Sequence, residues 1–242
     1  MPRMARAVLP GVAHHLTQRG IDRQDVFFSD TQREVYLRLA ACAMPQFGVR
    51  VLAYCLMTNH VHWVVAPETE RSLAHAFGWM HGRYAQHVNT ARGRNGHLWQ
   101  NRFFSCALDD EHLWAAVRYV ERNPVRAGLV SLAEAWPWSS AGVRLGLGNT
   151  PAMMDLSTWR ERFTAEQWRQ TLLGASVTEA EQRLRVRTYT GRPAGSEEFV
   201  KQAEAALNRK LAPGKGGRPR KHVQEQMHDS SAEANLFAGG VA

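Results

Sequence analysis

Residues 54–65 read Tyr-Cys-Leu-Met-Thr-Asn-His-Val-His-Trp-Val-Val, a stretch that is apolar at both ends and polar in the middle. Its second half predicts a β-strand, because it is rich in β-branched and aromatic residues. Side chains i and i+2 of a strand point to the same face, so His60 and His62 would lie side by side while Val61 faces the core. Two imidazoles on one rigid strand are candidate ligands of a divalent metal ion. The alternative is that they are ordinary histidines of a sheet.

Length and composition bound the class of protein. The 242 residues suffice for one domain with a sizeable core and an appendage. No apolar run is long enough to predict a membrane span, the first residues do not form a secretory signal, and a cytoplasmic location is expected. The cysteines Cys42, Cys55 and Cys106 are far apart, which predicts buried free thiols. The net charge of +8 favours a polyanionic partner, although a GC-rich genome would also enrich arginine over lysine.

The order of the predicted elements indicates an α+β fold. We expect strands at 11–19, 49–57, 60–66 and 98–108, and helices at 31–46, 68–88 and from 109 or 110 to 122. Asn123 and Pro124 should end the last helix, because the residue before a proline leaves the α region. This order is typical of a ferredoxin-like fold, in which helices cover one face of an antiparallel sheet.

The second half of the chain differs in composition from the first. Three parts are predicted: an α+β domain at 1–145, a helical C-terminal extension at 146–211 and a basic flexible tail at 212–242. The tail is assigned because residues 213–222 are low in apolar content and hold four basic residues and no acidic one.

The predicted third helix supplies the groups that two histidine ligands would need. Tyr119 and Asn123 are four residues apart and therefore share one helical face. A metal ion held by the two imidazoles and the Asn123 amide oxygen would polarise a phosphate oxygen. Tyr119 could then attack the phosphorus, helped by arginines that neutralise the phosphate charge, such as Arg118, Arg122 and Arg126. Alternatively, Tyr119 is a half-buried core residue and Asn123 only caps the helix.

Three segments carry a resemblance to a known family. They are Ala53-Tyr-Cys-Leu-Met-Thr-Asn-His-Val-His62, Gly96-His-Leu-Trp-Gln-Asn-Arg-Phe103 and Arg118-Tyr-Val-Glu-Arg-Asn-Pro-Val-Arg-Ala-Gly-Leu-Val130. In this order they resemble the REP-associated tyrosine transposases, domesticated relatives of the single-tyrosine HUH transposases of bacterial insertion sequences. The resemblance covers roughly residues 1–145, and residues 191–199 and 217–221 resemble the C-terminal extension of many members.

The resemblance implies an HUH-type nuclease fold and a nickase and strand transferase that depends on Mg²⁺ or Mn²⁺ and acts on single-stranded DNA. Its substrates would be repetitive extragenic palindromes, folded as hairpins beside a guide tetranucleotide. By position, His60 and His62 would be metal ligands, Asn123 the third ligand, and Tyr119 the nucleophile that forms a covalent 5′-phosphotyrosine. Thr58 stands where the family usually has proline, which changes the turn more than the chemistry.

Basic side chains are the candidate DNA contacts, because guanidinium groups bind phosphates along a basic groove. The candidates are Arg19, Arg92, Arg94, Arg102, Arg118, Arg122, Arg126, Arg218, Arg220 and Lys221. With DNA as the partner, a nucleoid-associated location is expected. A monomer and a homodimer both stay open, and a monomer is slightly favoured.

Two other functions fit the same residues. One is a catalytically weak regulatory protein that keeps the fold and binds DNA hairpins. The other is a hydrolytic metalloenzyme in which the histidines hold an activated water and Tyr119 only supports the fold. A further variant keeps the transposase chemistry but uses Tyr84, a second helical tyrosine, as a weaker candidate nucleophile.

Overall fold

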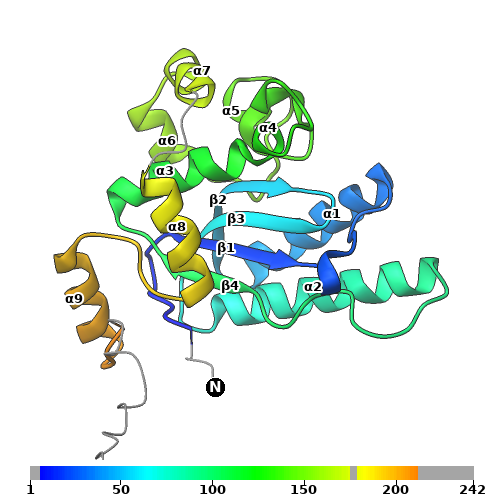
Figure 1. The fold of residues 1–242 in the computed structure, drawn as a ribbon, viewed down its shortest axis with the longest axis horizontal. Coiled ribbons are helices and arrows are strands. Elements are labelled where there is room, and N and C mark those ends of the chain that lie inside the picture. Colours follow the sequence, from blue (N-terminus) through cyan, green and yellow to red (C-terminus); the bar gives the residue numbers. More distant parts are fainter. Residues whose placement is uncertain (1–5, 175–178, 212–242) are drawn as a thin grey trace, which may run out of the picture. The chain divides into compact units, whose positions relative to one another are not determined.

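The structure, a computed structural model, describes residues 6–174 and 179–211, which belong to one compact unit. Strands and helices follow one another in the predicted order up to the third long helix (Figure 1). The predicted basic tail, with Arg218, Arg220 and Lys221, lies outside the described residues. The division of the chain at residues 145 and 211 stays a prediction.

The central element is a four-stranded antiparallel sheet. Its strands are β1 (His14–Arg19), β2 (Val49–Leu56), β3 (His60–Pro67) and β4 (Phe104–Ala107), in the spatial order β2-β3-β1-β4. β3 is an inner strand, and the residues opposite His60 and His62 on β1 are Arg19 and Thr17. The predicted fold class, an antiparallel α+β sheet, is confirmed.

Helices cover both faces of this sheet. One face carries α1 (Asp30–Gln46) and α2 (Ser72–Ala91), as the ferredoxin-like pattern predicts. The other carries α3 (Asp110–Glu121), continued by α4 (Asn123–Arg126), and α8 (Glu179–Thr190) (Figure 1). The expectation that helices cover only one face of the sheet was therefore wrong.

Shorter elements complete the chain. They are α5 (Ala141–Arg144), α6 (Ser157–Arg162), α7 (Ala165–Leu173), α9 (Glu197–Ala206) and 3-10 turns at Ile21–Arg23 and Ala133–Ala135. Among the described helices, none is both long and apolar enough to span a membrane.

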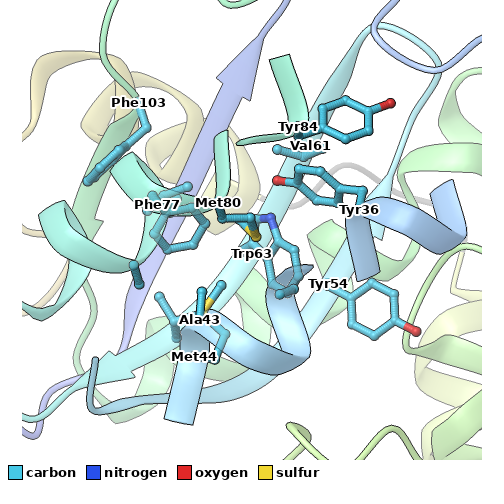
Figure 2. Close-up of a cluster of buried hydrophobic side chains, with 14 of the residues drawn as sticks. Tyr36, Ala43, Met44, Tyr54, Val61, Trp63, Phe77, Met80, Tyr84 and Phe103 are labelled. Carbon is cyan, nitrogen blue, oxygen red and sulfur yellow. The ribbon is translucent and has the colours of Figure 1, made fainter. Parts of the chain in front are cut away.

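The core between the sheet and the first two helices is built around Trp63. Its ring lies 6.1 Å from Tyr36 on α1 and 6.0 Å from Phe77 on α2, measured between ring centroids (Figure 2). Val61 shares this side of the sheet and is also fully buried. The alternation predicted for residues 60–65 therefore holds, and it turns the intervening side chains of β3 to the opposite face.

The fourth strand is shorter than the sequence predicts. Residues 98–103 leave the ladder because Asn101 adopts a left-handed conformation with φ of 56°, which asparagine tolerates better than most residues. Trp99 still pairs as an isolated bridge with Gly20. Trp99 and Phe103 are buried in the core, whereas Phe104 is 37% exposed.

The three cysteines are free, as predicted. Cys55 and Cys106 are buried in the sheet, but Cys42 is exposed, contrary to the expectation of burial for all three. Cys42 lies on the solvent side of α1, since the helix buries Tyr36, Ala40, Ala43 and Met44 instead.

Two buried histidines should make stability depend on pH. His14 keeps one ring nitrogen 2.8 Å from the Val12 carbonyl oxygen, and His81 has its Nε2 2.8 Å from the Tyr36 hydroxyl. Burial lowers the pKa of His14 to about 4 and that of His81 to about 3. An unfolded histidine titrates near pH 6.5, so between pH 7 and pH 5 the unfolded chain takes up protons that the folded chain does not.

We therefore expect stability to fall as the pH falls, by about 2 kcal/mol for each of these histidines between pH 7 and pH 5. Urea unfolding at the two pH values measures the loss. A His81→Gln variant should lose about 2 kcal/mol less than the wild type over this interval, whatever its stability at pH 7. The exposed His87 on the same helix offers a matched site for the same substitution.

Candidate active site

A cavity of about 230 Å³ lies at the ends of β1 and β3, beside α3, α4 and α8. His60, His62, Tyr119 and Asn123 all line this cavity. The four side chains predicted as ligands and nucleophile are thus brought together within one chain. No second subunit is needed to assemble them.

His60 presents one ring nitrogen to the cavity because the other is fixed. Its Nδ1 lies 2.6 Å from Asn59 Oδ1. The Asn59 amide nitrogen donates to the Arg23 carbonyl oxygen at 3.0 Å, which sets the amide orientation. Since a carboxamide oxygen can only accept, His60 Nδ1 carries the proton. Its Nε2 therefore holds a free lone pair, which a metal ion requires.

His62 is more deeply enclosed, with 5% of its surface exposed. Its Nδ1 lies 3.0 Å from Nε2 of His15 on β1, and the two rings are stacked. Nε2 is therefore the nitrogen of His62 that remains for a ligand in the cavity. The rings of His60 and His62 are 4.9 Å apart between centroids, which places both next to one position.

Asn123 combines a helix cap with a free oxygen. α3 ends at Glu121, but α4 begins directly at Asn123, because proline is tolerated in the first turn of a helix. The Asn123 amide nitrogen donates to the Tyr119 carbonyl oxygen at 2.9 Å. Within the described residues its Oδ1 has no hydrogen-bond partner, so the capping bond leaves this oxygen available as a candidate ligand.

Tyr119 is held among these groups with 6% of its surface exposed. The edges of the His15 and His62 rings meet it at centroid distances of 5.6 Å. The Arg126 guanidinium lies 4.5 Å from its ring centroid, a cation–π contact. No hydrogen bond of the described residues engages its hydroxyl group, which leaves the oxygen available for reaction.

The electrostatics of the cavity keep both histidines neutral. Burial, with smaller contributions from Arg19 and Arg126, lowers the pKa of His60 to about 4. The pKa of His62 lies well below its ordinary value, mainly because of burial and then because of His60 and His15. Neutral imidazoles are the form that binds metal ions. Two imidazole nitrogens and one amide oxygen are donors that fit a divalent ion with open positions.

The donor set is unusual in its third member. Across residues 6–174 and 179–211, no group of three or more His, Cys, Asp or Glu side chains is arranged to hold a metal ion. The third candidate donor that lines this cavity is the Asn123 amide oxygen.

The predicted DNA-binding arginines separate into two groups. Arg19 and Arg126 line the cavity. Arg118 instead pairs with Glu181 and donates to the Thr171 carbonyl oxygen at 2.8 Å. Arg122 donates to the Leu172 carbonyl oxygen at 2.6 Å. Both side chains are engaged with the C-terminal extension, and a DNA contact by either stays a prediction.

The other predicted arginines lie elsewhere on the surface. Arg92 stacks on Phe28 at 3.7 Å, and Arg94 contacts Gln24. Arg102 lines a second cavity, of about 410 Å³, beside α2. A DNA contact by any of these three stays a prediction.

Four residues in or behind the cavity were not predicted from the sequence. Arg185 and Tyr189 on α8 line the cavity, and His15 and Thr188 stand behind His62. β1 occupies His14–Arg19 within the predicted strand 11–19, but nothing in the sequence pairs His15 with His62. For α8, the buried Leu184 and Thr188 mark an inner face, yet the sequence does not say what that face covers.

Comparison with known proteins agrees with this geometry. Residues 10–123 match the family model described as "Transposase IS200 like". A Haemophilus influenzae protein that carries the name REP-associated tyrosine transposase is 26% identical over 105 residues, which is 39% of this chain and 60% of the relative's length. A solved structure of a REP-associated tyrosine transposase bound to a REP hairpin superposes with a TM-score of 0.52 at 20% identity, covering 65% of this chain and 94% of that one.

Both sequence likenesses are to transposases. The resemblance to the REP-associated tyrosine transposases is confirmed, and the solved structure has a similar fold. The matched segment ends at Asn123, the last of the four residues predicted as ligands and nucleophile, so α5 to α9 lie beyond it.

Proposed function

We propose that this chain is a metal-dependent endonuclease and strand transferase that cuts single-stranded DNA beside a hairpin through a covalent tyrosine intermediate. One observation carries the proposal: Tyr119, the two histidines and Asn123 line one cavity within one chain. The hairpin is proposed because the superposed solved structure is described as bound to a REP hairpin. A REP-type palindrome is accordingly the proposed substrate.

The cavity residues suit Mg²⁺ or Mn²⁺. His60 Nε2, His62 Nε2 and Asn123 Oδ1 would hold the ion. When bound, it would act as a Lewis acid on a phosphate oxygen. Arg19 and Arg126 would add positive charge beside the same phosphate, which favours the charge that builds up during attack.

The reaction of Tyr119 is a transesterification. Its phenolic oxygen forms a bond to phosphorus as the bond from phosphorus to the 3′-oxygen breaks. The phenol gives up its proton, and the departing 3′-oxygen takes one up to become a hydroxyl. The product is a 5′-phosphotyrosine ester, which a second 3′-hydroxyl can attack by the reverse route. Strand transfer then needs no nucleotide cofactor.

Denaturing gels test this proposal. Hairpins with unpaired flanks and a label at the 3′ end would be incubated with the full chain and Mn²⁺, Mg²⁺ or EDTA. We expect a labelled protein–DNA adduct that survives denaturation and requires the metal ion, because the 3′-side fragment stays bound through its 5′ phosphate. Labelled fragments without an adduct would indicate a hydrolytic enzyme. Tight, salt-dependent binding without either product would indicate a regulatory protein.

A further inference from the structure

A buried chain of hydrogen bonds connects α8 to His62. His62 Nδ1 lies 3.0 Å from His15 Nε2, and His15 Nδ1 lies 2.7 Å from the Thr188 hydroxyl. The Thr188 hydroxyl in turn donates to the Leu184 carbonyl oxygen at 2.7 Å, one turn earlier on α8. Thr188 lies well beyond the matched segment 10–123.

The single proton of the Thr188 hydroxyl decides which atom donates in every hydrogen bond of this series. It is used toward Leu184, since a carbonyl oxygen can only accept. The hydroxyl oxygen must then accept the Nδ1 proton of His15. A neutral imidazole carries one proton, so His15 Nε2 is an acceptor. His62 must therefore donate from Nδ1, which leaves the lone pair of His62 on Nε2.

The two residues behind His62 are enclosed. His15 and Thr188 are each 1% exposed. The Cys106 thiol, 3.3 Å from the Thr188 oxygen, closes the remaining side. In so closed a position no bulk water can replace a lost partner, and a buried group without a partner is costly. The direction of the bonds is thus set by the protein and not by solvent.

We propose that Thr188 is a positioning residue for the metal site: through His15 it holds His62 in the Nδ1–H form and so presents the Nε2 lone pair to the ion. This inference rests on the proposed function insofar as it assigns His62 as a ligand. We call the series of hydrogen bonds from Thr188 through His15 to His62 the relay. Because α8 supplies Thr188, the C-terminal extension would help to orient a ligand of the metal ion. Groups that orient metal-bound histidines commonly change affinity by about 10–100-fold when removed.

The test begins with the metal-free full-length wild type. Nitrogen-15 NMR of the histidine rings distinguishes the Nδ1–H form from the Nε2–H form. We expect His62 as Nδ1–H and His15 as Nδ1–H. Finding His62 as Nε2–H would overturn the proposal. This readout needs no cleavage and no bound ion, so its result does not depend on whether the protein has the proposed enzymatic activity.

Three variants extend the test to metal binding. Thr188→Val removes the hydroxyl at nearly constant volume and should weaken Mn²⁺ binding, measured by calorimetry, by about 10–100-fold. Thr188→Ser keeps the hydroxyl and should restore most of the affinity. Thr190→Val is the control, because among the described residues the exposed Thr190 hydroxyl bonds only within α8, to the carbonyl oxygens of Val186 and Arg187.

Equal Mn²⁺ affinity of Thr188→Val and wild type, with His62 unchanged in the ring spectrum, would refute the relay. If the valine variant proves too unstable to measure, the serine variant and the wild-type spectrum still decide. If the wild type itself binds no metal ion and forms no adduct, the proposed function fails, while the ring spectrum continues to report on the relay.

Discussion

Tyr119→Phe is expected to abolish the covalent protein–DNA adduct and to lower strand cleavage by on the order of 10³-fold or more, while hairpin binding survives. The variant removes only the oxygen that would attack phosphorus. The ring keeps its contacts with His15, His62 and Arg126, so the cavity should keep its shape. Denaturing gels for the adduct and equilibrium binding for the hairpin check the two halves of this expectation.

Two other tyrosines provide matched controls. Tyr84→Phe removes a hydroxyl that donates to the Val26 carbonyl oxygen at 2.7 Å in the core, on the opposite face of the sheet. It should cost stability but leave cleavage intact, which would also settle the weaker candidate nucleophile. Tyr189 lines the cavity but is 52% exposed, and its ring contacts Phe104. Full cleavage by Tyr119→Phe, or loss of the adduct in Tyr189→Phe alone, would refute Tyr119 as the nucleophile.

Glu121→Ala is expected to destabilise the fold by about 3–5 kcal/mol, because it leaves a buried charge without its partner. Glu121 lies on α3 and is fully buried. Arg144 and Ser140 donate to one carboxylate oxygen at 2.8 Å and 2.6 Å, and Trp168 donates to the other at 2.8 Å. The carboxylate therefore ties α3 to α5 and α7, beyond the matched segment. Urea unfolding of the variant at neutral pH measures the loss.

Two further variants separate the charge from its surroundings. Glu134→Ala removes a carboxylate from a more open ion pair with Arg169, at 3.5 Å, and should cost about 1 kcal/mol or less. In the double variant Glu121→Ala with Arg144→Ala, part of the loss should be recovered, since neither charge is left alone. If Glu121→Ala were no more harmful than Glu134→Ala, the buried network would not contribute as inferred.

Much of the candidate site was predictable because it depends on local periodicity. The two-residue repeat of β3 places His60 and His62 on one face and Val61 in the core. The four-residue spacing in a helix brings Tyr119 and Asn123 to one side. Arg118 and Arg122 are also four apart, but they lie one residue before that pair and so face α7 and α8 instead. Proximity along the sequence alone does not assign a helical residue to a site.

The remainder depends on contacts between distant segments. His15 meets His62 because β1 and β3 are neighbours in the sheet, and Thr188 meets His15 because α8 packs on β1 and β4. No periodicity in one segment reveals such a pairing. The shortened β4 has a local cause, the left-handed backbone at Asn101. Asparagine permits that conformation without requiring it, so the sequence left it open.

If Tyr119 is the nucleophile proposed above, its placement beside the candidate ligands of its own chain has a stoichiometric consequence. With one nucleophile per cavity, a chain would carry one DNA end covalently at any moment. The rate of the first cut would then be proportional to the protein concentration. Joining that end to a second strand would require either that the same chain resolves its ester before cutting again, or that two chains each hold one end.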